Sequence, residues 1–386
     1  MTIFDVRPEA GLQRAPTGDG WVAASHAAVN AVLRGPGWSS DHRKATGYAA
    51  HDLGLAVPEV AGELLAKVLL FMDAPDHTRL RGLVSKAFTL RSVERLRPRI
   101  AQLTEELLAP LRDAGRFDVI HDFAFPLPVT VICELLGVPT DDREMFRHLT
   151  RDLAVILDGD VTAAQLGGAA GAMLNLTAYL VPLFEERRRA PQADLISALV
   201  EAEEAGDRLG ADELLTTVAL LLIAGHETTM NLIGNGMLAL LRNPDQLALV
   251  RARPELMAPA VEELLRYDSP VRLTIRTALQ DAIVAGETVR AGEQVIAMLH
   301  AANHDPAVFE SPDALDITRD AHRHVAFGGG AHYCLGAALA RTEAQIALAA
   351  LVALPHLELV SDEPVWRPLL MLHALASLPV ACRAAG

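Results

Sequence analysis

The chain has 386 residues, of which 51% are hydrophobic and 4% aromatic, and its formal net charge is −15. Such an acidic chain is a poor candidate for non-specific binding to nucleic acid, whose phosphates repel it. The three cysteines, Cys133, Cys334 and Cys382, are widely spaced and form no C-x-x-C, which argues against a zinc ribbon, a dithiol redox site or a disulfide framework.

The beginning of the chain shows no targeting signal. "MTIFDVRPEAG" has no basic region followed by an apolar stretch, so no signal peptide is expected. Apolar runs such as "VALLLIAG" are far shorter than the roughly 18 residues of a membrane span. We therefore expect a cytoplasmic protein without a membrane anchor.

Helical periodicity predicts helices at roughly 92–113, 124–137, 173–188, 211–242, 255–268 and 335–353. Residues 211–242 are apolar on nearly all sides and end before Pro244, so they predict a core helix about 48 Å long. Short β-type runs with glycine punctuation predict strands between 272 and 300, and another near the C-terminus. The fold class is therefore mainly α with a small β portion, expected as a single domain over residues 1–386.

The stretch "FGGGAHYCLG", residues 327–336, places Cys334 where a glycine loop turns into a long helix. Backbone N–H groups and the positive end of that helix favour a thiolate at this position. A thiolate is either a nucleophile or a metal ligand, and this stretch alone leaves both open.

The predicted core helix contains "AGHETT", residues 224–229, which places Gly225, a carboxylate and two threonines among apolar residues. Each is locally unfavourable there, so a functional site is favoured over a polar stripe on a half-exposed helix. His226-Glu227 begins an H-E-x-x-H zinc motif, but the fifth position is Met230, so the second ligand is missing.

Two further pairs have helical spacing. Arg266 follows Glu263 at i,i+3 and Glu262 at i,i+4, which by itself describes an ordinary surface ion pair. His77 and Arg81 share one helix face, which is either a solvated basic face or an anion site. No phosphate-binding G-x-x-x-x-G-K-[ST] loop and no G-x-S-x-G elbow of a serine hydrolase is present.

These four motifs, in this order, resemble the haem-thiolate monooxygenases of the cytochrome P-450 superfamily, in particular the soluble bacterial type. "FGGGAHYCLG" fits the haem-loop pattern F-G-x-G-x-H-x-C-x-G, "AGHETT" the oxygen-activating helix, Glu263 to Arg266 the E-x-x-R, and "HTRLR" the H-x-x-x-R. The resemblance extends from about residue 73 to the C-terminus. It implies the fold of that family, with haem between the long core helix and the helix after the cysteine loop.

The resemblance assigns roles around a haem b. Cys334 is the proximal thiolate ligand of the iron, Phe327 packs near the ring, and the glycines let the backbone pass close beneath the porphyrin. The partners implied for the two propionates are His77, Arg81, Arg276 and His332. Glu263 and Arg266 become a buried structural pair that supports the haem loop.

On the distal side, the resemblance assigns Thr228 to a proton-donating water network and Glu227 to its connection with solvent, while Gly225 lets the helix widen. The implied substrate pocket includes Ala224 and the segments 271–275 and 369–372, with Val271, Thr274 and Leu370 as lining residues. Residues 50–72 and 150–175 would form a lid, for which "LGGAAGAM" suggests a flexible cover. The aliphatic composition favours a lipophilic small-molecule substrate.

Two positions depart from the family, since His304 and His373 stand where its members often have arginine. Within enzymes, the alternative reading is a peroxide-driven peroxygenase, and in another class it is a non-catalytic haem-binding sensor. The Glu227-Thr228 pair argues against both. No flavin, nicotinamide or ferredoxin fingerprint is present, so a ferredoxin and its reductase are expected to supply electrons to a cationic patch, with Arg79, Lys86, Arg91 and Arg323 as candidates.

Overall fold

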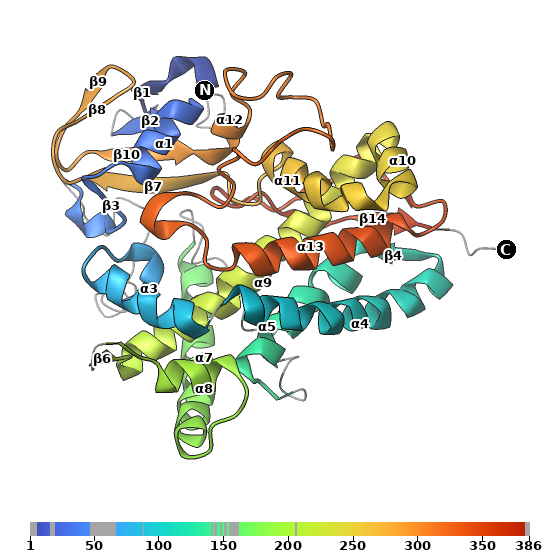
Figure 1. Ribbon diagram of the computed structural model, residues 1–386, viewed down its shortest axis with the longest axis horizontal. Helices are drawn as coiled ribbons and strands as arrows, with labels where there is room; N and C mark the ends of the chain where they lie inside the picture. Colours follow the sequence, from blue (N-terminus) through green and yellow to red (C-terminus); the bar gives the residue numbers. More distant parts are fainter. Residues whose placement is uncertain are drawn as a thin grey trace. The chain divides into compact units, whose positions relative to one another are not determined.

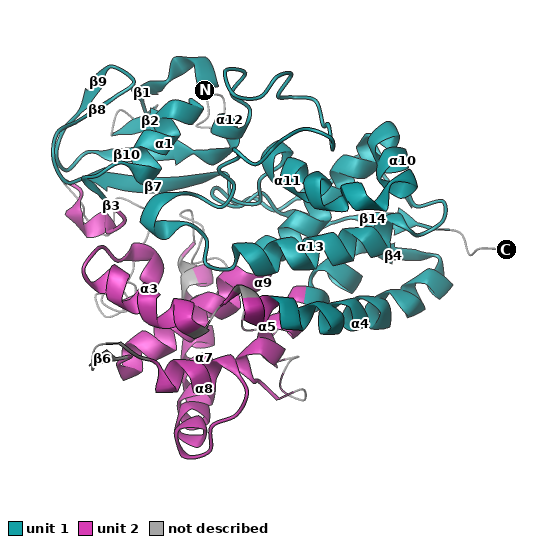
Figure 2. Cartoon of the chain, in the orientation of Figure 1, with its two compact units in different colours: residues 1–38, 94–127, 228–386 teal, residues 39–93, 128–227 magenta. Residues whose placement is uncertain are grey.

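The computed structural model describes residues 6–15, 20–46, 67–87, 89–139, 162–204 and 207–382, together with residues 142, 145, 146, 149 and 153. The chain divides into two compact units, coloured separately in Figure 2. The larger unit comprises Met1–Trp38, Glu94–Leu127 and Thr228–Gly386, and the smaller unit comprises Ser39–Val93 and Pro128–Glu227. Each unit is described by itself below.

The larger unit contains a five-stranded sheet with the order β1-β2-β10-β7-β3. Its strands are β1 (Leu12–Arg14), β2 (Trp21–Ala23), β10 (Gln294–Met298), β7 (Leu273–Ala278) and β3 (Trp38–Ser39). β10 pairs in parallel with β2 and antiparallel with β7. The strands predicted between 272 and 300 are confirmed as β7, β8 (Ala282–Val284), β9 (Glu287–Val289) and β10.

Helix α1 (His26–Arg34) covers one face of this sheet (Figure 1). Alternation along the strands turns Val295 and Ala297 toward α1, while Ile296 and Met298 face the opposite side. The side chain of Ser25 begins α1 by accepting a hydrogen bond from the N–H of Ala28. This helix was not predicted from the sequence, and its C-terminal residues Leu33 and Arg34 lie next to Gly329 and Gly330 of the cysteine loop.

Of six further helices of the larger unit, three match the predicted segments 92–113, 255–268 and 335–353, and the other three were not predicted. The six are most of α4 (Leu90–Ala114), the π-helix η5 (Val119–Ala124), α10 (Pro244–Ala252), α11 (Met257–Tyr267), α12 (Leu299–Asn303) and α13 (Ala337–Val352). A three-stranded sheet joins β4 (Arg116–Asp118), β14 (Pro379–Ala381) and β11 (Glu358–Leu359), and β12 (Val365–Trp366) pairs with β13 (Leu375–Ser377). The strand predicted near the C-terminus is therefore confirmed.

Helix α9 (Ala211–Arg242) confirms the predicted core helix with both of its boundaries. It is one continuous helix of 32 residues, although the boundary between the two units falls between Glu227 and Thr228. Every residue from 229 to 240 is buried. A helix that is apolar on all sides is stable only when it is enclosed, and this accounts for its place in the core.

The smaller unit contains α3 (Asp76–Ala87), most of α5 (Pro126–Leu136), α7 (Ala163–Arg189) and α8 (Leu195–Glu201), together with the short hairpin β5 (Glu203–Glu204) and β6 (Asp207–Arg208). α7 and α8 are joined by Arg187, which donates to Asp194 at 2.6 Å and to the carbonyl of Gly137 at 2.9 Å. Arg187 is only 3% exposed, so this bonding compensates the burial of its charge.

The region expected to form a lid is only partly described. Residues 47–66 and most of 150–161 lie outside the described residues. "LGGAAGAM", expected to be a flexible cover, is instead part of the continuous helix α7. A Cβ added at Gly167, Gly168 or Gly171 would meet no atom within 4 Å, so packing does not require glycine at these positions.

Two helical stretches among the described residues reach the length and apolar composition of a membrane span, Val119–Leu136 and Gly167–Arg189. Neither stretch was expected from the sequence, because each mixes apolar residues with polar ones and contains no long uninterrupted apolar run. The first stretch is 67% buried inside the fold, as a core helix is, and the second is 33% buried. Composition of this kind is weak support for a membrane contact.

Candidate functional site

The cysteine loop is held by backbone hydrogen bonds that present one thiol at the start of α13. The N–H of Cys334 donates to the carbonyl of Phe327 at 3.0 Å, and Gly336 is the N-cap residue of α13. Cys334 is half-buried, whereas Cys133 and Cys382 are buried. Cys334 is therefore the cysteine that a cofactor can reach, and it lies beside the positive end of a helix.

Two loop glycines are needed for a reason that the sequence did not reveal. Gly328 and Gly330 have φ angles of +68° and +65°, a left-handed conformation that favours glycine. A Cβ at Gly330 would lie 2.2 Å from the carbonyl oxygen of Leu33 in α1. At Gly330 the close neighbour is therefore α1, which packs against the loop.

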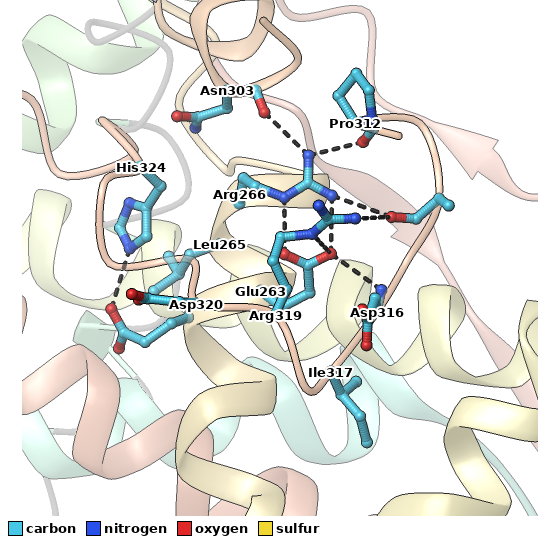
Figure 3. Close-up of polar contacts among 12 residues, drawn as sticks. Glu263, Leu265, Arg266, Asn303, Pro312, Asp316, Ile317, Arg319, Asp320 and His324 are labelled. Atoms are coloured by element: carbon cyan, nitrogen blue, oxygen red, sulfur yellow. Dashed lines mark hydrogen bonds and ion pairs between the residues drawn. The ribbon is translucent and has the colours of Figure 1, made fainter. Parts of the chain in front are cut away.

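Figure 3 shows a buried ion-pair network around Glu263 and Arg266. Arg266 makes a bidentate pair with Glu263, at 2.7 and 2.8 Å, and both side chains are 0% exposed. Its remaining donors bond the carbonyls of Asn303, Pro312 and Ala314. Arg319 adds a third charge by donating to Glu263 at 3.1 Å. The prediction of a surface ion pair is wrong, because both side chains are fully buried. The network joins α11 to the segment 303–319.

Glu262 does not pair with Arg266, although the i,i+4 spacing allowed it. Its carboxylate accepts two hydrogen bonds from Arg341 of α13, at 2.6 and 2.8 Å, and one from His324 at 3.1 Å. The side chains of neighbouring residues in a helix point about 100° apart, so Glu262 and Glu263 form hydrogen bonds with different partners. This correction makes Glu262 a link between α11, α13 and the chain that enters the cysteine loop.

The half-exposed residues of the core helix lie on one face. Between Leu214 and Leu240, the residues of α9 that are not buried are Leu220, Leu221, Ala224, Gly225 and Thr228. Their spacing of three or four residues places them in one stripe along the helix. The residues of this stripe are the partly exposed ones between Leu214 and Leu240, and they include the threonine and the alanine predicted for the site.

Next to this stripe, His226 and Glu227 are buried, at 0% and 2% exposure. The Nδ1 of His226 donates to the carbonyl of Leu222 at 2.7 Å, and its Nε2 lies 3.8 Å from the Glu227 carboxylate. The sequence motif suggested His226 only as a zinc ligand, and in the structure its ring lies near the carboxylate of Glu227 instead. α9 is an uninterrupted α-helix through Gly225, so the expected widening is not seen.

The cationic residues expected near propionates are distributed over both units. In the larger unit, Arg276 is 8% exposed and donates to the Thr274 hydroxyl at 2.9 Å, and His332 ends the short helix η9 (Gly330–His332). In the smaller unit, His77 and Arg81 lie on α3, with His77 only 3% exposed.

The two segments predicted to line the pocket do lie side by side. Val271 forms an isolated bridge with Leu372, and the N–H of Arg272 donates to the carbonyl of Met371 at 2.8 Å. Val271, Thr274 and Leu370 are all half-buried, as lining residues should be. Ala224 belongs to the smaller unit.

The two histidines that depart from the family pattern behave differently. His373 stacks on Trp366 with ring centroids 3.7 Å apart, and its Nδ1 lies 2.5 Å from the Asp268 carboxylate. His304 donates to the carbonyl of His300, and burial lowers its pKa. Because a lowered pKa leaves His304 neutral at neutral pH, it does not supply the charge of the usual arginine.

Fold and site together define a mainly helical protein that presents one accessible thiol from a glycine loop. Comparison with known proteins identifies the family. The cytochrome P-450 family matches residues 168–379, and the chain belongs to this family.

The relatives cover most of the chain. It is 49% identical to cytochrome P-450 107B1 of Saccharopolyspora erythraea, over 81% of this chain and 76% of that protein. It is 43% identical to vitamin D(3) 25-hydroxylase of Pseudonocardia autotrophica, over 95% of this chain and 88% of that protein. The crystal structure of P450BioI in complex with an acyl carrier protein ligated to hexadec-9Z-enoic acid superposes with a TM-score of 0.87, at 40% identity over 94% of this chain and 92% of that one. The chain is therefore an enzyme of the cytochrome P-450 monooxygenase class, and membership implies a haem cofactor.

The residues present fit that cofactor. A half-buried thiol stands at the N-terminus of α13, where a thiolate is favoured, and one stripe of an otherwise buried helix remains accessible. Cysteine thiolate is one of the axial ligands that proteins use for haem iron.

Proposed function

We propose that this enzyme hydroxylates a lipophilic small molecule with haem b as its cofactor. The overall reaction is RH + O2 + 2 e⁻ + 2 H⁺ → ROH + H2O, so electrons and protons must both be delivered from outside the substrate. The observation that carries the proposal is the placement of Cys334, half-buried at the start of α13 in a loop held from Phe327 to Gly336. When bound, the haem supplies the redox chemistry that divides dioxygen between product and water.

The chain's own residues would bind and orient the cofactor. Cys334 would hold the iron, because the helix N-terminus stabilises its negative charge. The two propionates are anionic and need cationic partners, for which we propose His77, Arg81, Arg276 and His332. Phe327 would cover the sulfur side of the ring. Glu263 and Arg266 would act at a distance, by fixing the segment that leads into the loop.

Proton delivery would depend on Thr228 and its neighbours in α9. Thr228 belongs to the accessible stripe, so its hydroxyl can hold a water molecule or a proton donor. Glu227 is buried, and the Nε2 of His226 is 3.8 Å from its carboxylate. We therefore propose that protons reach Glu227 by way of buried neighbours, His226 among them, rather than directly from solvent.

The substrate would be lipophilic, because the half-buried residues expected to line the pocket are mostly aliphatic. This proposal is supported by two relatives whose names specify lipids, a vitamin D(3) hydroxylase and a protein bound to an acylated carrier protein. The retained Glu227-Thr228 pair favours dioxygen activation over a peroxide-driven reaction or a sensor role. Titration of the haem absorption spectrum of the holoenzyme with a panel of sterols, fatty acids and macrolides would identify the substrate class.

Thr228→Ala is expected to uncouple electron use from product formation. The change removes one hydroxyl and leaves the cysteine loop untouched, so haem content and folding should stay close to those of the wild type. Without the positioned proton donor, electrons should still be consumed while hydrogen peroxide replaces product. The measurement is product formed per reducing equivalent, with hydrogen peroxide assayed in parallel.

Thr229→Ala is the matched control, since this neighbouring threonine is buried at 2% exposure outside the stripe. It should keep the coupling of the wild type. Glu227→Gln should instead slow overall turnover, by about 10²-fold, as expected when a proton donor is lost. Wild-type coupling in Thr228→Ala, with a substrate that carries no hydroxyl, would contradict the role proposed for Thr228.

We further propose that a ferredoxin and its reductase supply the electrons in the cytoplasm. An acidic carrier would be attracted by cationic residues, so reduction should slow as ionic strength rises. Of the four candidates, Arg79 forms an ion pair with Glu213, which partly neutralises the charge that an acidic carrier would bind. Arg91 and Arg323 are exposed, so Arg91→Ala and Arg323→Ala should reduce the second-order rate more than Arg79→Ala does. A rate that is independent of ionic strength would rule out this electrostatic docking.

A further inference from the structure

The Glu262 cluster, formed by Glu262, His324 and Arg341, connects three parts of the larger unit beside the cysteine loop. Glu262 lies on α11, Arg341 on α13, and His324 in the chain that leads to Phe327. The guanidinium carbon of Arg341 lies 4.4 Å from the centre of the Phe327 ring. The ring of His324 lies 5.8 Å from that of Phe327, so two members of the cluster contact the first residue of the loop.

The protonation of His324 follows from its two hydrogen bonds. The N–H of Ala326 donates to Nδ1 at 3.1 Å, so this nitrogen is an acceptor. Nε2 lies 3.1 Å from the Glu262 carboxylate, which can only accept, so the proton belongs on Nε2. Both ring nitrogens of His324 are therefore used in hydrogen bonds within the fold.

The charges of Glu262 and Arg341 persist at neutral pH. Burial by itself would raise the pKa of Glu262, but hydrogen bonds from His324 and Arg341 outweigh it and lower the pKa to about 2. Burial opposes the charge of Arg341, but the hydrogen bond to Glu262 outweighs it and raises the pKa of the guanidinium. The other titratable groups nearby are Tyr333, whose hydroxyl is 3.3 Å from Arg341, and the exposed His322, 4.0 Å from Glu262.

Of the two charged residues of the ion pair, Arg341 is the one that contacts the cysteine loop. Arg341 contacts the face of Phe327, and the carbonyl of Phe327 accepts the hydrogen bond of the Cys334 N–H. The hydrogen bonds of Glu262 go to Arg341 and His324, which are the two residues that contact this ring. A positive charge close to a redox centre favours the reduced state, and a negative charge disfavours it.

We propose that the Glu262 cluster is a positioning and electrostatic device that sets the reduction potential of the haem site through Phe327 and the cysteine loop. The inference rests on the haem-thiolate function proposed above. Arg341 raises the potential by its charge, and Glu262 holds Arg341 in place while partly cancelling that charge. Neither residue is proposed to contact the substrate.

The test is the reduction potential of the substrate-free holoenzyme, measured by equilibration with a dye of known potential. Arg341→Gln should lower the ratio of reduced to oxidised protein at a fixed potential, by about threefold to tenfold for one charge near a buried site. Glu262→Gln should raise this ratio. The double variant should return toward the wild type, and Arg341→Lys, which keeps the charge, should stay close to it.

The opposite shifts of the reduction potential expected for Arg341→Gln and Glu262→Gln distinguish an electrostatic role from a purely structural one. Simple loosening of the loop would move both single variants in the same direction, and that result would overturn the proposal. The exposed pair Arg253 and Glu255, 2.9 Å apart, is the matched control, and neutralising either residue should leave the potential unchanged. Thermal unfolding of each variant checks that it is folded.

The experiment also distinguishes this inference from the function on which it rests. If the wild-type protein shows no thiolate-type carbon-monoxide spectrum, the proposed function fails. If that spectrum is present while Arg341→Gln and Glu262→Gln leave the potential unchanged, only the role of the cluster fails.

Discussion

Cys334→Ala is expected to abolish the red-shifted Soret band that the reduced carbon-monoxide complex of a thiolate-ligated haem shows. Alanine offers no ligand, so any haem that remains must be held by its propionates or by an adventitious nitrogen. The readout is the reduced carbon-monoxide difference spectrum, with haem content determined separately. Product formation should fall to the background of free haem.

Cys133→Ala and Cys382→Ala are the matched controls, because both thiols are buried and outside the loop. Both variants should keep the thiolate-type band, with at most a modest loss of stability from the small cavity that each creates. A histidine-type spectrum in freshly prepared wild-type protein would contradict the assignment of Cys334. So would survival of the wild-type band in Cys334→Ala.

Arg266→Ala should be the most destabilising of the substitutions considered. It leaves the carboxylate of Glu263 buried at 0% exposure and removes the donors from the carbonyls of Asn303 and Pro312. Breaking a buried pair from one side costs about 3–5 kcal/mol of unfolding free energy. We expect poor haem incorporation or failure to fold, measured by denaturant unfolding and by the haem content of the purified protein.

The matched control is Arg97→Ala, which breaks an ion pair with Glu94 at the same i,i+3 spacing. Those two side chains are 43% and 64% exposed, so the loss should be within about 1 kcal/mol. Arg266→Lys should behave nearly as badly as Arg266→Ala, because one ammonium cannot make the bidentate pair and the carbonyl contacts together. If Arg266→Ala unfolds like Arg97→Ala, the network is not what holds the segment 303–319.

Much of the local structure could be predicted from the sequence because its signals are local. The core helix was predicted as 211–242 and observed as Ala211–Arg242, since a long apolar run and Pro244 define it without knowledge of its neighbours. The strands between 272 and 300 follow from glycine punctuation and β-branched residues. In contrast, α1 was missed, since "HAAVNAVLR" is short and its stability comes from packing on β2 and β10.

The chemistry of the site was likewise visible in the sequence, because it depends on residue types at short spacing. A cysteine after a glycine loop and before a helix is in a position that favours a thiolate, as a nucleophile or as a metal ligand. The family resemblance then assigned a haem to Cys334, and the comparisons support membership in that family. What the loop glycines are needed for did not follow, because the atoms that crowd Gly330 belong to Leu33, about 300 residues earlier in the chain.

The sequence by itself determined which residues could form the site and its ion pairs. Only the tertiary structure decided which partner each of these residues binds. Glu262 and Glu263 are chemically identical, and both stand within reach of Arg266 along the helix. Their separation arises because α11 turns by about 100° per residue, so that one glutamate faces the segment around Arg319 and the other faces Arg341 and His324. Those partners come from residues more than 50 positions away, and no local rule carries that information. The physical reason is that burying a carboxylate costs desolvation free energy unless a cation pairs with it. The fold determines which cation lies close enough to do so.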